Sequence, residues 1–357
     1  MGSVFVHTLG DSTLDNLYWM LNQDGSNLEE AKQNSVEGQL QTCLGSDNYE
    51  VVSHAYDGFT TASIHDGDHV GRVLGIRPGY VFDKRAAYLI GKNITPTLKN
   101  FSIHPLDALK SSINEHPDGI HYVVISVGGN DFRERLFSPV AMLQEIPHIH
   151  ERYLKLLSEV KLLGTLRNIR PIIMLQYRLD ANDDCYGIYR ILKVVGGIFA
   201  SMQALGTVGI ALSVGLVAAG KISLIAAAVL GIASIATLYL SSRIIPFKVT
   251  LGLLQGKDLG MASLGGLMET FYRPILERAK QDGIPVLDLP NTFDPNAPLY
   301  THQIEPNKQG GTVIAEGLSH IILNHDYSTP SMLYAKKAND NNYSPTLNPG
   351  ATGWQVN

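Results

Sequence analysis

Two long stretches without a charged residue place the strongest limit on what this chain of 357 residues can fold into. The first covers residues 194–219 and the second covers residues 222–242, and only Gly220 and Lys221 separate them. A helix of about 20 apolar residues crosses the hydrocarbon core of a bilayer, which is roughly 30 Å thick. Each stretch is long enough for such a helix, and the short polar break predicts a transmembrane helical hairpin over residues 191–248.

The charges around the two stretches indicate an orientation for this hairpin. Basic residues flank its outer ends, whereas a single one lies at its tip: Arg190, Lys193, Arg243 and Lys248 lie outside, and Lys221 lies at the tip. Because cytoplasmic loops carry the excess of Lys and Arg, we expect both outer ends on the cytoplasmic side of a membrane that holds residues 194–242. The alternatives are a buried helical hairpin in a soluble protein and an apolar lid over a lipid site.

Outside the hairpin, apolar runs typical of strands alternate with helical patterns. The strand-like runs cover residues 3–9, 50–56, 120–127, 171–177 and 284–288, and the clearest helical patterns cover 28–43, 105–116, 140–165 and 264–282. Near-continuous apolar strands between helices favour a parallel sheet that is covered on both faces, so we predict an α/β fold.

We expect one α/β domain, formed by residues 1–190 and 249–325, that the hairpin interrupts. Residues 326–357 show no periodicity and are rich in Asn, Pro and Ser, so we expect a flexible C-terminal tail there.

Composition limits the partners and cofactors that this chain is expected to bind. Acidic residues outnumber basic ones by 33 to 28, and no basic stripe is present, so nucleic acid is not an expected partner. Cys43 and Cys185 are the only cysteines, too few for a cysteine metal site, and we expect neither a metal ion nor a cofactor. None of these features indicates an oligomeric state.

Polar residues that suit nucleophilic catalysis follow the first three predicted strands. Ser12 ends the first strand, and the carboxyl ends of strands in an open parallel sheet are where ligands bind. A serine becomes a nucleophile when a base takes its proton and hydrogen-bond donors stabilise the oxyanion that forms. Gly58, after the second strand, can offer its backbone N–H, and Asn130, after the third, can offer its side-chain amide.

Four further polar residues beside these positions are expected to have structural roles. Asp11 is expected to accept backbone N–H groups around the Ser12 loop, and Asp131 to brace its own loop in a similar way. Asp15 and Asn16 are expected to cap the helix that follows.

These residues resemble the motif blocks of the SGNH/GDSL hydrolase superfamily in order and spacing. The matching segments are "GDSTLDN" at 10–16, Gly58, "GGND" at 128–131 and residues 284–322. The resemblance covers about residues 1–190 and 249–325. It implies a three-layer α/β/α sandwich of flavodoxin type with a five-stranded parallel sheet. It also implies that Ser12 attacks an acyl ester, while the Ser12 N–H, the Gly58 N–H and the Asn130 side chain form the oxyanion hole.

The last block departs from the pattern of that superfamily. Its members usually carry Asp-x-x-His followed by Pro, whereas this chain has His302 and Glu305 in exchanged positions before Pro306. Two mechanisms stay open. His302 is the base and Glu305 orients it, or Glu305 takes the proton itself with a pKa that burial raises. A third possibility is a site that binds but does not turn over.

The sequence therefore predicts a membrane-anchored serine esterase or lipase that cleaves an acyl ester, with a lipid ester as one candidate, through an acyl-serine intermediate. We expect its catalytic domain on the cytoplasmic side of the membrane. The alternative is a catalytically impaired SGNH domain that binds a lipid or protein partner at the membrane.

Overall fold

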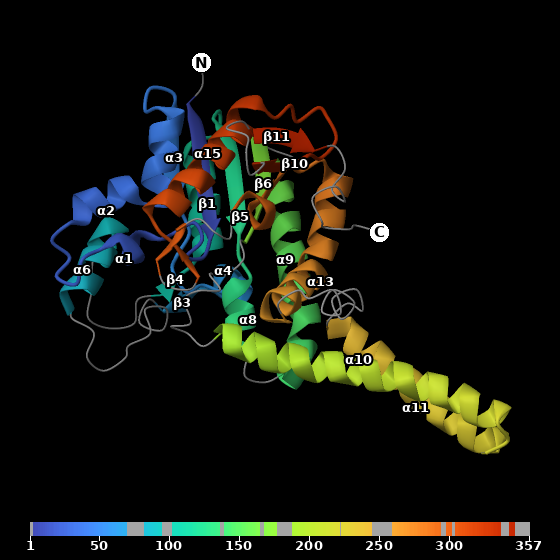
Figure 1. Ribbon diagram of the computed structural model, residues 1–357. Coiled ribbons are helices and arrows are strands. Elements are labelled where there is room, and N and C mark those ends of the chain that lie inside the picture. The colour runs from blue at the N-terminus through green and yellow to red at the C-terminus, as the bar shows by residue number, and fades with distance from the viewer. Residues whose placement is uncertain are drawn as a thin grey trace. The chain divides into compact units, whose positions relative to one another are not determined.

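A seven-stranded sheet is the centre of the structure, a computed structural model, in the order β11-β10-β7-β6-β5-β1-β2 (Figure 1). The structure describes residues 3–69, 82–94, 102–135, 139–164, 168–176, 188–221, 223–244, 259–293, 298–301, 304–336 and 343–346. The strands are β1 (Val4–Gly10), β2 (Tyr49–Ser53), β5 (Ile120–Ser126), β6 (Asn168–Leu175), β7 (Val286–Asp288), β10 (Leu333–Lys336) and β11 (Tyr343–Thr346). All are parallel to their neighbours except β11, which pairs antiparallel with β10.

The α/β fold is confirmed, but the prediction of a five-stranded sheet is wrong. The five predicted strands are β1, β2, β5, β6 and β7, and their spatial order β2-β1-β5-β6-β7 is the flavodoxin-like order. The other two strands come from residues 326–357, where we expected only a flexible tail. In β10, Leu333 and Tyr334 are buried beside Val286 and Leu287 of β7. A strand of four residues is too short to show a period, so packing and not pattern determines it.

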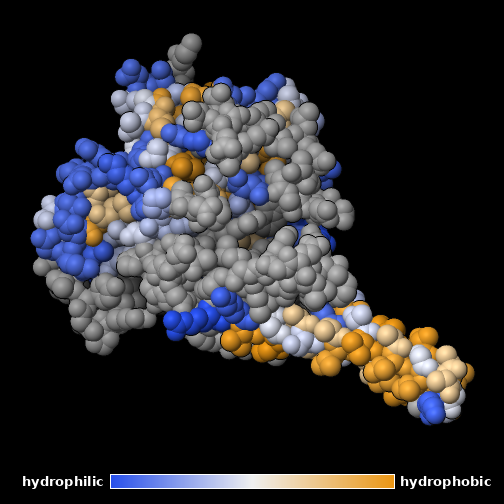
Figure 2. Space-filling model, viewed as in Figure 1, coloured by the Kyte–Doolittle hydropathy of each residue, from blue (hydrophilic) through white to orange (hydrophobic). Residues whose placement is uncertain are grey.

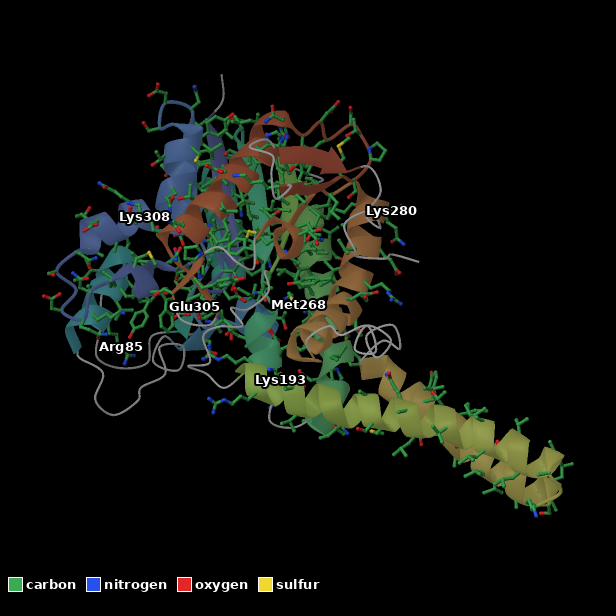
Figure 3. The ribbon with its side chains drawn as sticks, viewed as in Figure 1. Arg85, Lys193, Met268, Lys280, Glu305 and Lys308 are labelled. Atoms are coloured by element: carbon green, nitrogen blue, oxygen red, sulfur yellow. The ribbon has the colours of Figure 1, made fainter. Side chains whose placement is uncertain are left out.

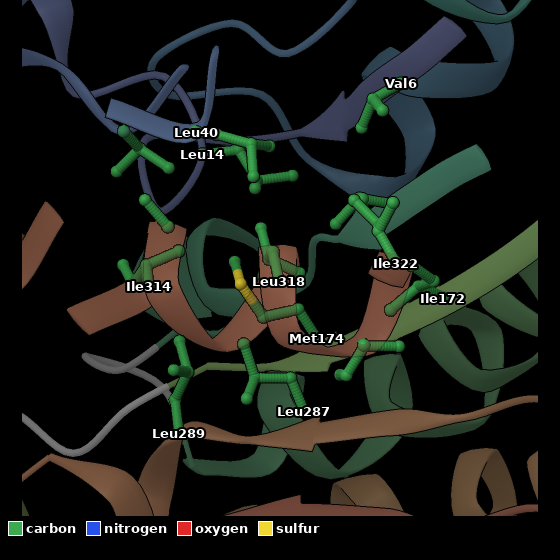
Figure 4. Packing of buried hydrophobic residues seen from close by; sticks show 14 of the residues in the cluster. Val6, Leu14, Leu40, Ile172, Met174, Leu287, Leu289, Ile314, Leu318 and Ile322 are labelled. Carbon is green, nitrogen blue, oxygen red and sulfur yellow. The ribbon is translucent and has the colours of Figure 1, made fainter. Parts of the chain in front are cut away.

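Helices lie against both faces of the sheet. On one face, α3 (Val36–Leu44) and α15 (Lys308–Asn324) pack together over alternate residues of the strands, and Figure 4 shows this core. It includes Val6, Leu40, Ile172, Met174, Leu287, Ile314, Leu318 and Ile322. On the other face, α7 (Pro105–Glu115) packs against β1, and the ring of Phe5 stacks on His116 with centroids 4.2 Å apart. Burial on both faces explains why the strands are almost continuously apolar.

The structure also contains further helices and two small two-stranded sheets. The helices are α1 (Leu17–Met20), α2 (Leu28–Asn34), α4 (Thr61–Asp66), α6 (Phe82–Gly91), α8 (Gly129–Arg135), α9 (Pro139–Gly164), α13 (Leu259–Asp282) and α14 (Leu289–Thr292). Two small sheets pair β3 (Asp68–His69) with β4 (Ser102–Ile103), and β8 (Tyr300–Thr301) with β9 (Glu305–Pro306). The helix predicted over 28–43 is interrupted at Ser35, whose side chain accepts the Gly38 N–H and starts α3.

The chain divides into two compact units. One comprises Met1–Arg135, Gln144–Asp180 and Pro274–Asn357, and the other comprises Leu136–Leu143 and Ala181–Arg273. The second unit contains α10 (Ile188–Ala218) and α11 (Leu224–Ile244), which pack against each other. Among the described residues, one helix, Gly196–Ala218, is long and apolar enough to cross a membrane, and the apolar stretch Leu224–Tyr239 is shorter.

The helix pair α10 and α11 is polar inside and apolar outside. Gln203, Ser213 and Ser234 are buried, whereas Leu205 and Ile225 are 69% and 78% exposed. The outer surface of the two helices is largely hydrophobic (Figure 2). A Cβ atom added to Gly209 would lie 2.1 Å from Ser234 Oγ, so the helices are close at this glycine. A pair of helices folded in water has the opposite polarity.

A chain of three buried histidines crosses three neighbouring strands. His7 Nδ1 lies 3.2 Å from His54 Nε2, and His7 Nε2 lies 3.0 Å from His121 Nδ1. His121 Nε2 lies 2.9 Å from the His116 carbonyl oxygen, which can only accept. His121 therefore donates from Nε2, and with His121 and His7 neutral, their Nδ1 atoms accept from Nε2 of His7 and of His54. Burial lowers the pKa of His7 to about 2 and that of His54 to about 4, and the charge of Lys92 also acts on His54.

We predict that His7 and His54 reduce the stability of this protein in acid. The unfolded chain takes up their protons near pH 6.5, whereas the folded chain does not until the pH approaches 4 for His54 and 2 for His7. Their contribution is lost as the pH falls below about 6, by about 1.4 kcal/mol per pH unit for each histidine that stays neutral. The buried carboxyl groups of Asp11 and Asp57, whose pKa is raised, contribute with the opposite sign. The histidine contribution is therefore the difference in slope between the native protein and a histidine variant, measured by urea unfolding between pH 7 and 4.

The variant His7→Leu tests the origin of the slope. It is less stable at pH 7, because it breaks the chain of hydrogen bonds, but its stability changes with pH by about one proton less. His148→Gln, at an exposed position on α9, is the matched control and keeps the slope of the native protein. An unchanged slope in His7→Leu would contradict the prediction.

Candidate active site

The ends of β1, β2 and β5 are tied together at the edge of the sheet where Ser12 lies. The register of β1 and β5 continues to the pair Gly10 and Ser126, and the Asp11 N–H donates to the Ser126 carbonyl at 3.1 Å. On the other side, the Tyr56 N–H donates to the Gly10 carbonyl at 3.0 Å. A Cβ atom on Gly10 would lie 1.9 Å from the Ser126 oxygen, so this approach requires glycine.

The segment from Tyr56 to Phe59 forms a tight turn beside Ser12. The Phe59 N–H donates to the Tyr56 carbonyl at 3.2 Å, and Gly58 has φ of +81°. Asn93 is the one non-glycine residue with a positive φ in the described part of the chain, so Asp57 has a negative one and the turn is of type II. The Asn130 side chain donates to the Phe59 carbonyl at 3.0 Å and so joins the loop after β5 to this turn.

The three donors that the sequence predicts for an oxyanion hole retain hydrogen-bonding capacity. Neither the Ser12 N–H nor the Gly58 N–H donates to another group in the described part of the chain. The Asn130 amide uses one of its two protons on Phe59 and retains the other. Uncommitted backbone donors on loops that are tied together suit the binding of a developing negative charge on a substrate oxygen.

Glu305 is a fully buried carboxylate next to Ser12. It lies on β9, and its place in the fold is marked in Figure 3. Neither carboxylate oxygen has a partner in good hydrogen-bond geometry among the described residues, although the Ser12 hydroxyl is close enough to stabilise the charged form. Burial raises the pKa of Glu305 well above its usual value, and the charge of Asp57 adds to this. His302 lies outside the described residues.

Asn16 connects the Ser12 loop to the strand that carries Glu305. Its side-chain amide donates to the Pro306 carbonyl at 3.0 Å, and its side-chain oxygen accepts the Val36 N–H at 2.8 Å. Asn16 precedes α1, but its side chain makes no capping bond there, so the expectation that it caps this helix is wrong. The two distant partners use both of its polar atoms.

Asp11 is buried below the Ser12 loop. Its carboxylate accepts the Thr13 N–H at 3.1 Å and the Gln176 side-chain amide at 2.5 Å. Burial raises the pKa of Asp11 to about 6, and these two donors oppose the rise. Asp11 therefore links the first block of the site to the end of β6.

Asp131 holds α4 against α8. It accepts the Thr61 N–H at 2.8 Å and the Thr61 hydroxyl at 2.6 Å, and Arg152 lies 3.3 Å from one of its oxygens. Burial raises the pKa of Asp131, and the bonds from Thr61 and the charge of Arg152 oppose this. Asp131 directly follows Asn130 in the chain, so these bonds tie the Asn130 loop to the fold.

Asp15 and Asp57 are two site carboxylates whose surroundings the sequence does not indicate. Asp15 makes contacts with Tyr88, Lys92 and the Asp57 N–H instead of capping α1. Burial raises the pKa of Asp57 to about 7, and the charge of Asp15 contributes. Among the described residues, no group of three or more His, Cys, Asp and Glu side chains is arranged to hold a metal ion.

A comparison of this chain with protein-family models, with curated proteins and with solved structures finds no match.

We predict that Asn16→Ala destabilises the protein, because it leaves the buried Val36 N–H and the Pro306 carbonyl without partners. The expected loss is about 1–3 kcal/mol of the free energy of unfolding, measured by urea denaturation. Asn324→Ala is the control, since the exposed side chain of Asn324 donates to the His320 carbonyl of its own helix, and we expect it to stay within about 0.5 kcal/mol of the native protein. Equal losses in both variants would contradict this role for Asn16.

Proposed function

We propose that this chain is a membrane-anchored serine esterase of the SGNH type. The observation that carries the proposal is the position of the Ser12 hydroxyl beside the buried carboxyl group of Glu305, whose oxygens have no other hydrogen-bond partner among the described residues. A buried carboxyl group with unsatisfied oxygens is costly, and such groups occur in folded proteins where function requires them. The uncommitted N–H groups of Ser12 and Gly58 and the strand order β2-β1-β5-β6-β7 support the same proposal.

The proposed reaction is the hydrolysis of an acyl ester in two steps. Ser12 Oγ attacks the carbonyl carbon, its proton passes to the base, and the Ser12 N–H, the Gly58 N–H and Asn130 stabilise the negative oxygen. The bond to the alcohol breaks, and the alcohol leaves with the proton from the base. Water then attacks the acyl-serine and releases the carboxylic acid and free Ser12.

Glu305 is the base in this proposal. It lies next to the Ser12 hydroxyl, so a proton can pass between them without an intermediate group. Its raised pKa gives the carboxylate more basicity than a solvated glutamate has. The mechanism with His302 as the base is the second candidate, and the pH dependence of the reaction separates the two.

We predict that a fluorophosphonate probe labels the native protein in detergent and does not label Ser12→Ala. Peptide mass spectrometry places the label, and we expect it on the peptide that contains Ser12. Ser201→Ala, at an exposed position on α10, serves as control and labels like the native protein. A native protein that no probe labels would sink the esterase proposal and favour the binding module.

We predict that kcat/KM for a neutral ester still rises with pH well above the range in which a solvated glutamate titrates. The base must be deprotonated to act, and the pKa of Glu305 is raised well above its usual value, so the active form grows as the pH increases. Glu305→Gln loses activity at least 100-fold, whereas His302→Ala keeps most of it. A profile that levels off near pH 6.5, together with equal losses in both variants, would assign the base to His302 instead.

The membrane anchor in this proposal is the pair of α10 and α11. Apolar side chains cover their outer surface, and the hydroxyl groups of Ser201, Thr207 and Thr237 bond to carbonyls of their own helix at 2.8–2.9 Å. Polar groups that are satisfied inside the helix suit a hydrocarbon environment, which offers no hydrogen bonds. We infer that the pair inserts as a hairpin with its outer ends on the cytoplasmic side.

We predict that the full chain sediments with membranes in the absence of detergent. The triple variant Leu205→Arg, Leu212→Arg and Ile232→Arg moves to the supernatant, because each outward arginine costs about 2.5–3.5 kcal/mol in the bilayer. The matched control places arginine at Leu162 and Leu323, which are exposed on α9 and α15, and stays with the membrane. Native protein in the supernatant would contradict the anchor.

A further inference from the structure

Each backbone N–H of the turn that ends at Phe59 has an acceptor among the described residues, with one exception. The Tyr56 N–H donates to Gly10, the Asp57 N–H to Asp15 and the Phe59 N–H to Tyr56, at 3.0, 3.2 and 3.2 Å. The Phe59 carbonyl accepts from Asn130. The Gly58 N–H is the one left without a partner among the described residues, so the bonds around it determine where it points.

The bond from the Asp57 N–H orients the peptide between Tyr56 and Asp57, which directly precedes the central peptide of the turn. The central peptide, between Asp57 and Gly58, carries the Gly58 N–H. An acceptor on the Asp57 N–H anchors this peptide from one side, and the bond from Asn130 to the Phe59 carbonyl anchors it from the other. Asp15 Oδ2 accepts the Asp57 N–H at 3.2 Å, and the Tyr88 hydroxyl, which donates to the same oxygen at 2.5 Å, is a second and longer acceptor at 3.4 Å.

Asp15 in turn is held by a buried lysine. Lys92 follows α6 directly, and its Nζ lies 3.4 Å from Asp15 Oδ2 and 3.6 Å from Glu37 Oε2. The side chain of Lys92 is 3% exposed and that of Asp15 is fully buried. Lys92 also donates to the Ser53 hydroxyl at the end of β2 and lies over the ring of Tyr56. A buried ion pair with several hydrogen bonds has little freedom to move.

We propose that Asp15 is a positioning residue that holds the Gly58 N–H in the orientation needed to bind the oxyanion of the proposed esterase reaction. Lys92 balances the buried charge of Asp15, Asp15 fixes the Asp57 N–H, and the turn then presents the Gly58 N–H. Neither residue touches the substrate. The inference rests on the proposed function, since the oxyanion exists only if Ser12 attacks an ester.

Charge and hydrogen bonding can be separated with two double variants. Lys92→Met with Asp15→Asn removes both charges and keeps an acceptor for the Asp57 N–H. Lys92→Met with Asp15→Leu removes both charges and the Asp15 acceptor, with a side chain of similar size, and leaves the Asp57 N–H only the longer bond to the Tyr88 hydroxyl. Both variants avoid a buried unpaired charge, which would otherwise risk the fold. They differ only in the acceptor that the inference requires.

We expect the Asn double variant to keep kcat for a neutral ester within about 3-fold of the native value. The Leu double variant loses kcat about 10- to 100-fold, while KM stays within about 3-fold, because an oxyanion donor acts in the transition state and not on the bound ester. Rates are expressed per Ser12 that a fluorophosphonate labels at completion, which corrects for unfolded protein. Equal kcat values in the two double variants would overturn the inference.

Glu37→Gln controls for the loss of a charge beside Lys92. Glu37 contacts Lys92 but makes no bond to the turn that ends at Phe59, so we expect kcat within about 3-fold of the native value. A loss of kcat as large as that in the Leu double variant would assign the effect to the balance of charges around Lys92 and overturn the positioning role of Asp15.

Amide hydrogen exchange measures the turn without any esterase activity. The peptide that covers residues 56–59 exchanges faster in the Leu double variant than in the Asn one, because only the Leu variant lacks the acceptor. Equal exchange would overturn the inference. A native protein that hydrolyses no ester and takes no label refutes the proposed function instead, and the exchange rates still decide whether Asp15 holds the turn.

Discussion

The close approach of β1 and β5 at Gly10 is the contact on which the site depends. The Ser126 carbonyl lies where a Cβ atom would be, and it accepts the Asp11 N–H immediately before Ser12. The Gly10 carbonyl accepts the Tyr56 N–H on its other side. A larger residue at this position would separate β1 from β5 and with them the loops that carry Ser12, the Tyr56–Phe59 turn and Asn130.

Buried carboxylates surround Ser12, and their partners distinguish their roles. Asp15 is paired with Lys92, Asp131 is paired with Arg152 and bonded to Thr61, and Asp11 accepts two hydrogen bonds. Each of these arrangements offsets the cost of burying a charge. Glu305 alone is fully buried with neither oxygen in a good hydrogen bond among the described residues. The carboxylate with the least compensation is the one beside the serine, which is the expected place for a group that must exchange a proton.

The sequence predicts the parts of this structure that local pattern determines. The alternation of apolar strands and helices is sufficient for the α/β fold, because the central strands β1 and β5 are buried on both faces. It is not sufficient for β10, a strand of four residues that tertiary packing stabilises. Motif spacing predicts Ser12, Gly58, Asn130 and Glu305 as members of the candidate site. Local capping rules give the wrong partners for Asp15 and Asn16, because both side chains bond to residues far along the chain, such as Lys92 and Pro306.

The position of the second unit in the chain explains how one sequence can contain two such different packing patterns. Most of that unit, Ala181–Arg273, lies between β6 and β7, which are adjacent parallel strands with Ile173 paired to Val286. The free energy of closing a loop grows only with the logarithm of its length, so a long insertion costs little more than a short one once the two strands are paired. The register of the sheet depends on its own hydrogen bonds and buried side chains, which the insertion does not interrupt. The helices α10 and α11 are therefore free to bury Ser213 and Ser234 and to expose leucine and isoleucine, the reverse of the pattern that stabilises the sheet.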